Sequence, residues 1–239
     1  MKAFELIRKQ WKGFALGGAL LTMLLTLAPP RVSADTIYSL SIPNTALSCC
    51  TGPYATVDVH LNSGTSATIT FDSLTNGGYL YLMAGTRAAD VNVNATSWTL
   101  GGLSGTNSLA GFSPGPLSNG GAQTAVDGFG SFNQTVNSFD GFSNSNTKIR
   151  FTLTNTGGTW AGDASVLAPN SGGSLAAIHG FACAAPCTIL SGAFATGYAS
   201  NGGATVPEPG TLLLLGSGLV GLGTVVSRRL FRRDPVEVA

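Results

Sequence analysis

Short runs of alternating polar and apolar residues, separated by glycine- and asparagine-rich turns, constrain the fold of this chain more than any other feature. The clearest run covers residues 148–154, KIRFTLT, and places Ile149, Phe151 and Leu153 on one face. Shorter runs of the same kind lie at residues 55–61, 68–71, 79–83, 91–93 and 97–100. Because these runs are short and follow a period of two, they predict an all-β body. We expect an antiparallel β-sandwich of the jelly-roll or immunoglobulin-like kind.

Three local signals refine this expectation. Asn76-Gly77-Gly78 is a turn signal directly before the run at 79–83, and it predicts a hairpin there. Residues 101–130 are rich in Gly, Ser, Asn and Pro, so we expect long loops with one short helix or strand. Residues 174–180 suit a single helical turn. No repeat of fixed period occurs, which argues against a solenoid.

The N-terminus carries a targeting feature outside this body. An apolar stretch over residues 14–27 follows a basic segment that contains Lys2, Arg8, Lys9 and Lys12. A signal peptide has this order, and Val32-Ser33-Ala34 offers small residues for cleavage between Ala34 and Asp35. We therefore expect residues 1–34 to be a signal peptide, with a retained short membrane anchor as the alternative, and residues 35–205 to be the mature body.

The body is weakly acidic and poor in charge. It contains seven aspartates and no glutamate, against the three basic residues Arg87, Lys148 and Arg150, so its net charge is −4. Nucleic-acid binding requires clustered Lys and Arg to neutralise phosphates. The composition therefore excludes nucleic acid as the expected partner and leaves a surface of uncharged Ser, Thr, Asn and Gly.

All four cysteines lie in the part of the chain that we expect to be exported, at Cys49, Cys50, Cys183 and Cys187. An even number of cysteines in an oxidising compartment favours disulfides. Three connectivities remain open. Two of them join the first strand region to the last, and the third pairs Cys49 with Cys50 and Cys183 with Cys187. A zinc site is the alternative, but two adjacent cysteines hardly reach one tetrahedral ion together.

Catalytic constellations are sparse. Asp58 and His60 stand two residues apart on one face of a predicted strand, where they form either a solvent-facing polar row or a metal-binding pair. His179 lies near Cys183 and Cys187, which suits a cysteine–histidine nucleophile pair only if those cysteines are reduced. No Gly-x-Ser-x-Gly elbow, His-Glu-x-x-His helix or Walker loop is present. The sequence predicts no enzymatic activity, no cofactor and no metal.

Residues 206–233, VPEPGTLLLLGSGLVGLGTVVSRRLFRR, form a second targeting feature. The segment GSGLVG matches a dinucleotide-binding glycine pattern, but arginines follow directly where such a site needs a helix and a second strand. Residues 210–227 carry no charge and come close to membrane-spanning length, so they predict a single transmembrane helix. The basic cluster after it places the tail, residues 234–239, in the cytoplasm; it consists of Arg228, Arg229, Arg232 and Arg233.

The order of Val206-Pro207-Glu208-Pro209, apolar span and arginine cluster resembles the PEP-CTERM sorting signal of exported bacterial proteins. The resemblance implies an exosortase as partner, which cuts near Pro207-Glu208-Pro209 after a transient stay in the inner membrane. It also implies delivery to the outer surface or extracellular matrix of a Gram-negative, polysaccharide-secreting bacterium. The tail after the arginines is longer than most such signals have.

The body has a weaker similarity to a group of small PEP-CTERM surface proteins without established activity, carried by segments such as 128–132, 149–153 and 176–179. We interpret Phe151 and Trp160 as core aromatics rather than ligand platforms. Two functions are then expected to compete. One is a structural or adhesive module of a biofilm that contacts exopolysaccharide. The other is an extracellular hydrolase or lyase, which would need two carboxylates about 5–10 Å apart.

Overall fold

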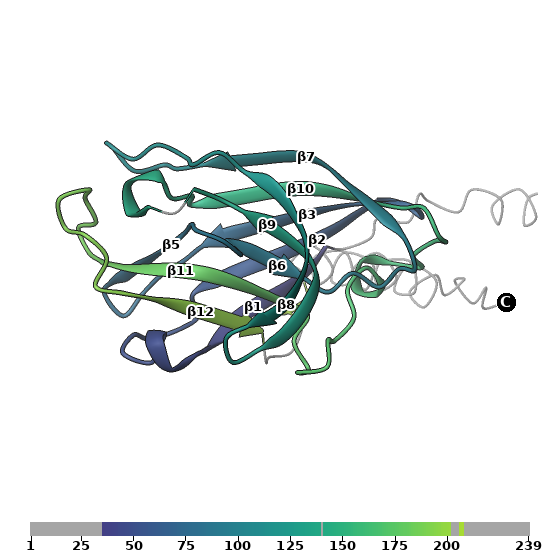
Figure 1. The fold of residues 1–239 in the computed structure, drawn as a ribbon, viewed down its shortest axis with the longest axis horizontal. Helices are drawn as coiled ribbons and strands as arrows, with labels where there is room; N and C mark the ends of the chain where they lie inside the picture. The colour runs from purple at the N-terminus through teal and green to yellow at the C-terminus, as the bar shows by residue number, and fades with distance from the viewer. Residues whose placement is uncertain (1–34, 140, 202–205, 208–239) are drawn as a thin grey trace, which may run out of the picture. The chain divides into compact units, whose positions relative to one another are not determined.

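The computed structural model describes residues 35–139, 141–201 and 206–207 (Figure 1). The predicted signal peptide, residues 1–34, and the predicted transmembrane helix, residues 210–227, lie outside the described residues. Within the described ranges, no helix has the length and apolar character needed to cross a membrane. These ranges hold β-strands and three short 3-10 helices.

The elements follow one another along the chain as β1 (Thr36–Pro43), η1 (Thr45–Leu47), β2 (Ala55–Ser63), β3 (Ser66–Ser73), β4 (Thr75–Asn76), β5 (Tyr79–Met83), β6 (Ala89–Val91), β7 (Trp98–Thr106), β8 (Ser118–Val126), β9 (Gly130–Asn137), η2 (Phe142–Asn144), β10 (Lys148–Asn155), η3 (Asp163–Ser165), β11 (Ala176–Ala184), β12 (Ala195–Asn201) and β13 (Val206–Pro207).

The strands form one continuous antiparallel sheet that folds over on itself. Its order is β7-β10-β3-β2-β1-β12-β11-β6-β9-β8, with β5 also paired to β11 and β13 paired to β1. The wall that contains β7, β10, β3 and β2 faces the wall that contains β11, β6 and β9 (Figure 1). The prediction of an all-β antiparallel sandwich is confirmed, and the two walls are joined where β1 pairs with β12.

The main core lies between these walls and follows the alternation in the sequence. Ile149, Phe151 and Leu153 of β10 are all fully buried, as predicted. Their strand pairs with β3, and Phe151 packs against Phe71 with ring centroids 6.2 Å apart. Every buried residue of this core lies between Tyr38 and Ala199. The body therefore has its own hydrophobic core, and we expect it to fold without the two terminal segments.

The predicted hairpin at Asn76-Gly77-Gly78 is confirmed in a short form. β4 pairs with β5 through Asn76 and Tyr79, and the two glycines between them have φ values of +56° and +83°. Two successive left-handed residues match the twist of a tight hairpin, and glycine adopts them without strain. The preceding long strand, β3, pairs with β2 and β10.

Two local expectations are wrong. Residues 174–180 do not form a helical turn, because residues 176–184 form β11, a central strand whose side chains are buried on both faces. A strand of that kind is apolar throughout and shows no alternation. The stretch 101–130 contains the end of β7 and all of β8, so it holds two strand segments instead of long loops with one short element. β8 is stabilised by β9, with several register shifts that its glycines permit.

Candidate functional site: a neutral groove at one end of the sandwich

The structure describes only part of the predicted sorting site. Val206 and Pro207 form β13 and pair with Ile37 and Thr36 at the start of β1. Ala34, Glu208, Pro209 and the basic cluster Arg228, Arg229, Arg232 and Arg233 lie outside the described residues. The first and the last strand of the body are therefore paired with each other. The processing motif starts in the last of these strands.

Asp58 and His60 do not form a metal-binding pair. The His60 Nδ1 atom lies 2.5 Å from the Asp35 carboxylate, and His60 is mostly exposed. The hydrogen bond with Asp35 raises the pKa of His60, so the protonated, ion-paired form is favoured. No group of three or more metal-ligating side chains gathers within the described ranges. His60 is thus exposed and paired with Asp35, whereas Asp58 is partly buried.

The cysteines form two local disulfides, Cys49–Cys50 and Cys183–Cys187. Of the three connectivities left open by the sequence, this is the one that joins neighbours and does not staple the first strand region to the last. No cysteine in the described part of the chain is free. His179 therefore has no thiol partner for nucleophilic chemistry, and its ring contacts the Ala84 carbonyl and the Thr196 hydroxyl.

A groove of about 620 Å³ opens where β10 ends and β7 begins. Two chain segments form most of its lining, residues 92–96 and residues 155–161, and Ser165 and Ala168 complete it. The segments are brought together by strand pairing, because Asn155 of β10 lies opposite Trp98 of β7. A hydrogen bond of 3.0 Å from the Thr156 amide to the Ser97 carbonyl extends the pairing of the two strands by one more residue.

The indole of Trp160 lies beneath this groove. Its side chain is only 4% exposed, and Nε1 donates a hydrogen bond of 2.8 Å to the Asn94 carbonyl. Its backbone amide donates to the Gly64 carbonyl at 2.7 Å. These contacts bear out the interpretation of Trp160 as a core aromatic. The residue supports the groove from below and offers a ligand little of its ring face.

Amide side chains form the polar part of the lining. Asn92 donates through Nδ2 to the Ala168 carbonyl at 2.9 Å, and Asn94 donates to the Ser165 carbonyl at 3.0 Å. Both amides are thereby oriented, since each is tied to the segment around η3 on the other side of the groove. Their Oδ1 atoms accept no hydrogen bond from another described residue, so two oriented acceptors are available to a ligand.

Glycines leave the mouth of the groove open. A Cβ atom at Gly158 would meet nothing within 4 Å, and its backbone is not in the left-handed region. At Gly157, by contrast, a Cβ atom would meet Ser97 Oγ at 2.8 Å. The space above Gly158 is therefore accessible to a ligand, and a side chain placed there would occupy it without strain.

None of the residues that line the groove is ionisable. The lining offers amide, hydroxyl and backbone groups together with small apolar surfaces. Such a site can hydrogen-bond an uncharged ligand, whereas it lacks a cation to hold a phosphate or carboxylate and a group to act as general acid or base. The groove is therefore polar but uncharged.

We did not predict this groove from the sequence. A signal was present, because Asn92, Asn94 and Thr96 alternate with Val91, Val93 and Ala95, which places the polar side chains on one face. The second segment, GGTWA at residues 157–161, has no periodicity that connects it to the first. The two segments are about sixty residues apart in the chain, and only the pairing of β7 with β10 makes them neighbours.

Comparisons with known proteins concern the C-terminus. Residues 205–233 match the model of the PEP-CTERM protein-sorting motif. The motif marks an exported protein that transits the membrane and is processed by an exosortase. No curated protein and no solved structure matches the chain. The motif thus indicates how the chain is sorted and contains no information on the body.

Proposed function

We propose that this exosortase-sorted protein is a structural or adhesive module of the bacterial outer surface or matrix, which binds exopolysaccharide in the groove between residues 92–96 and 155–161. The sorting motif at 205–233 supplies the export. The body supplies the binding, and it acts on the polymer without chemical change.

The neutral lining of the groove carries this proposal. Asn92 and Asn94 hold their Oδ1 acceptors in fixed positions, and the exposed Thr159 adds a hydroxyl that can both donate and accept. Polysaccharide hydroxyls need such partners along an accessible surface. Because the groove is open at Gly158, a polymer can lie across it and extend beyond it on both sides.

The groove offers little to the alternative, a polysaccharide hydrolase or lyase. A glycosidase uses two carboxyl groups roughly 5–10 Å apart, one of them with a raised pKa. Two acidic residues, Asp90 and Asp163, lie two positions from lining residues in the sequence, and both are buried. Asp163 accepts a hydrogen bond of 2.5 Å from the Leu61 amide. Its position in η3 serves to attach the Ser165 segment to β2. The groove therefore favours binding over hydrolysis.

The test uses the body, residues 35–207, and exopolysaccharide purified from the producing bacterium. We expect measurable binding by isothermal titration calorimetry. Gly158→Trp should fill the groove without disturbing the fold and lower the affinity by about tenfold or more, because the ligand loses its place against the amides. Gly101→Trp is the matched control, since that glycine is equally open but lies on β7 outside the groove.

The charge of the ligand provides a second criterion. Binding to a neutral polymer should change little between low and high ionic strength, because no ion pair in the groove is screened. A neutral glucan should compete with the natural polymer, and a polyuronate should not. Equal affinities for Gly158→Trp and wild type, or shortening of the polymer during incubation, would contradict the proposal.

A further inference from the structure

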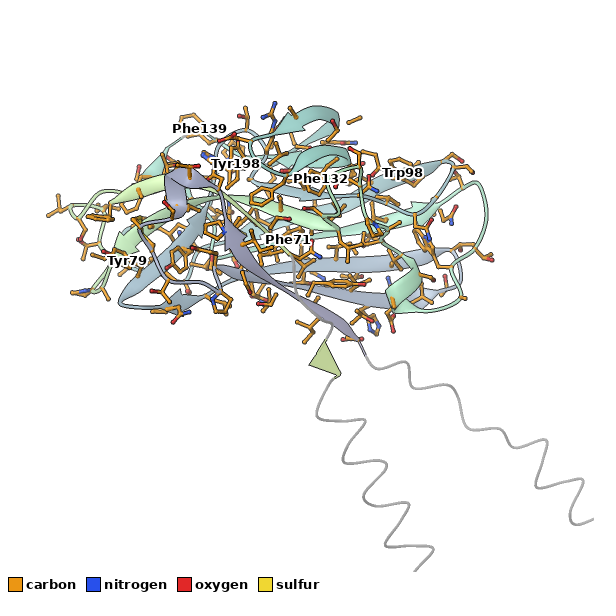
Figure 2. All side chains as sticks on the ribbon, turned by 90° about the horizontal axis from the view of Figure 1, so that it is seen from below. Phe71, Tyr79, Trp98, Phe132, Phe139 and Tyr198 are labelled. Atoms are coloured by element: carbon orange, nitrogen blue, oxygen red, sulfur yellow. A yellow bond between two sulfur atoms is a disulfide. The ribbon has the colours of Figure 1, made fainter. Side chains whose placement is uncertain are left out.

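The loop between β11 and β12 exposes a cluster of large hydrophobic side chains. Leu190 is 94% exposed, Phe194 63% and Ile189 44%. We call these three residues the apolar tip. Phe139, which is 52% exposed, lies at the same end of the sandwich in Figure 2. Exposed apolar clusters on soluble domains mark surfaces that meet an apolar partner.

The apolar tip lies far from the junction with the sorting motif. β12 begins at Ala195, beside the tip, and runs to Asn201, which pairs with Leu40 of β1. β1 extends beyond this pair to Thr36, which pairs with Pro207 of β13. Figure 1 shows the β11–β12 loop projecting at the left end of the sandwich. The tip therefore stays available whether or not the sorting motif is still attached.

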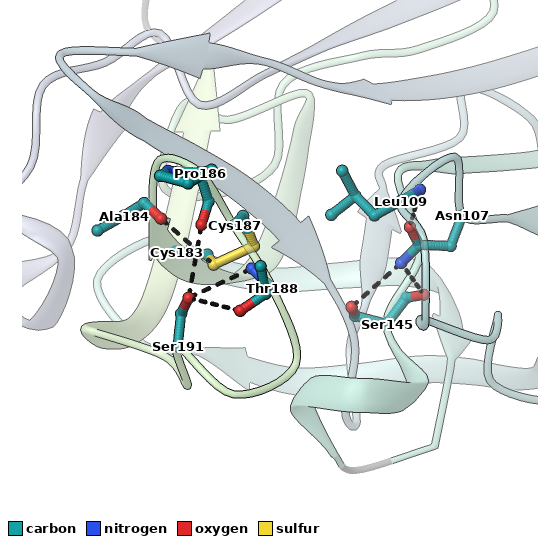
Figure 3. Close-up of a disulfide and its surroundings, with 9 residues drawn as sticks. All are labelled: Asn107, Leu109, Ser145, Cys183, Ala184, Pro186, Cys187, Thr188 and Ser191. Carbon is teal, nitrogen blue, oxygen red and sulfur yellow. Dashed lines mark hydrogen bonds between the residues drawn. A yellow bond between two sulfur atoms is a disulfide. The ribbon is translucent and has the colours of Figure 1, made fainter.

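The base of the loop is fixed in the fold. The Cys183–Cys187 disulfide closes it directly at the end of β11 (Figure 3). Cys183 is fully buried in a second apolar cluster on the outer face of β11, which also contains Leu82, Ala84, Phe112 and Phe181. Phe194, at the other end of the loop, packs on Tyr79 with ring centroids 5.3 Å apart. Both ends of the loop are thus fixed to the fold, and the apolar tip between them is exposed.

Several polar groups of the loop are paired within the loop or with β11. The Ser191 amide donates to the Thr188 carbonyl at 3.0 Å, and the two hydroxyls lie 2.9 Å apart. The Ser191 hydroxyl also accepts from the Thr188 amide at 3.3 Å (Figure 3). The Phe194 amide donates to the Ala182 carbonyl at 2.7 Å. Each polar group paired in this way costs less to bring to a bilayer surface than an unpaired one.

We propose that the apolar tip inserts into the surface of a phospholipid bilayer. Two observations favour lipid over a protein partner or a second copy. First, no charged residue occurs between Cys183 and Thr196, so the loop carries no group to orient a protein partner. Second, Leu190 projects almost fully, and a convex tip buries little surface against an identical tip. Fluid lipid adapts to any convex shape and buries such side chains completely.

Vesicle flotation tests this inference, which is independent of the groove. The body, residues 35–207, is mixed with large unilamellar vesicles of phosphatidylethanolamine and phosphatidylglycerol and centrifuged through a density step. We expect the wild type to float with the vesicles, in low and in high salt alike. Leu190→Ser should lower the partition coefficient by about tenfold, since it removes a large apolar side chain from the lipid phase. The double variant with Phe194→Ser should lower it further.

Ile42→Ser is the matched control, because Ile42 is 46% exposed on β1, away from the loop. It should float like the wild type, and both Ile42→Ser and Leu190→Ser should keep the wild-type thermal midpoint because the replaced side chains are exposed. Wild-type protein that stays at the bottom, or tip variants that float unchanged, would overturn the inference. So would a dimer that forms without vesicles and disappears with Leu190→Ser in sedimentation velocity, since the tip would then bind a second copy.

Discussion

Asp90 is a carboxylic acid buried among apolar residues of the body. It lies in β6, where its side chain is fully buried between β9 and β11 and accepts a hydrogen bond from the Thr135 hydroxyl. Its second oxygen has no partner among the described residues. Burial raises the pKa of Asp90 to about 8, although Thr135 and the charge of Arg87 act in the opposite direction. The folded protein therefore holds this group neutral at pH 7.

This residue makes the stability of the body depend on pH. The unfolded chain ionises Asp90 near its ordinary pKa of 3.8, whereas the folded chain keeps the proton up to about 8. The folded state thus binds more protons between these values. The contribution of Asp90 is complete below the lower pKa and is lost as pH rises through the upper one, by at most about 1.4 kcal/mol per pH unit.

We expect Asp90→Asn to flatten this pH dependence and to stabilise the body most on the alkaline side. Urea unfolding across the window between the two pKa values measures it. Asp72→Asn serves as a surface control, because Asp72 is paired with Lys148 at 2.9 Å and partly exposed. In this control, the free energy of unfolding should depend on pH as steeply as in the wild type. A slope that persists in Asp90→Asn would show that another group carries the pH dependence.

At the scale of elements, β11 organises the body. It is hydrogen-bonded to β12 on one side and to β5 and β6 on the other, and it separates the main core from the smaller cluster around Phe181. Its C-terminal end is closed by the Cys183–Cys187 disulfide. The β11–β12 loop projects from the end of this strand. A rigid end keeps the apolar tip exposed for the proposed contact with lipid.

Removal of this disulfide should therefore lower the stability of the body and loosen the loop at the end of β11. The double variant Cys183→Ala, Cys187→Ala should lose about 2 kcal/mol of unfolding free energy from the loop closure alone. Limited proteolysis should cut the loop faster than in the wild type. The matched variant Cys49→Ala, Cys50→Ala opens a bond between neighbours, which closes no chain loop, and should lose less. Non-reducing peptide mapping that found Cys49 or Cys50 joined to Cys183 or Cys187 would contradict both expectations.

Strands with strict alternation could be predicted, and strands without it could not. β2, β3 and β10 each show the period of two that one buried face requires. β11 lacks it because both of its faces are buried, and β8 lacks it because glycines take the place of side chains. The local sequence of such strands is compatible with a loop or a helical turn. Only their neighbours in the sheet select the extended conformation.

At the scale of the whole molecule, the two proposed binding sites lie at opposite ends of the body. The groove lies where β10 ends, which the strand registers place with the start of β1 and with the junction to the sorting motif. The apolar tip lies at the far end, beyond the start of β12. A polymer in the groove and a lipid surface at the tip therefore do not compete for space, and both contacts are compatible with one anchored or released body.

The basic cluster belongs to the sorting motif at residues 205–233, and we expect sorting to depend on it. Replacing Arg228, Arg229, Arg232 and Arg233 with Ala removes the charges that we expect to hold the C-terminus in the cytoplasm. The protein should then remain unprocessed or be misrouted, which cell fractionation and the mass of the mature protein will show. Lys148→Ala with Arg150→Ala removes positive charge from the body instead and should leave processing unchanged. Normal release of the four-arginine variant would refute the role of the cluster.

The sequence by itself determined the class of the fold and the route of the chain. Both depend on local patterns: alternation over a few residues for the strands, and the order of a Pro-Glu-Pro motif, an apolar span and arginines for sorting. The tertiary structure decided the disulfide pairing, the neutral state of Asp90, the groove and the position of the apolar tip. The groove joins segments far apart in the chain, and the neutral state of Asp90 depends on complete burial. The disulfide pairing and the position of the tip depend on how the ends of the strands are placed. No local pattern encodes such a relation, because it arises only when the sheet closes around its core.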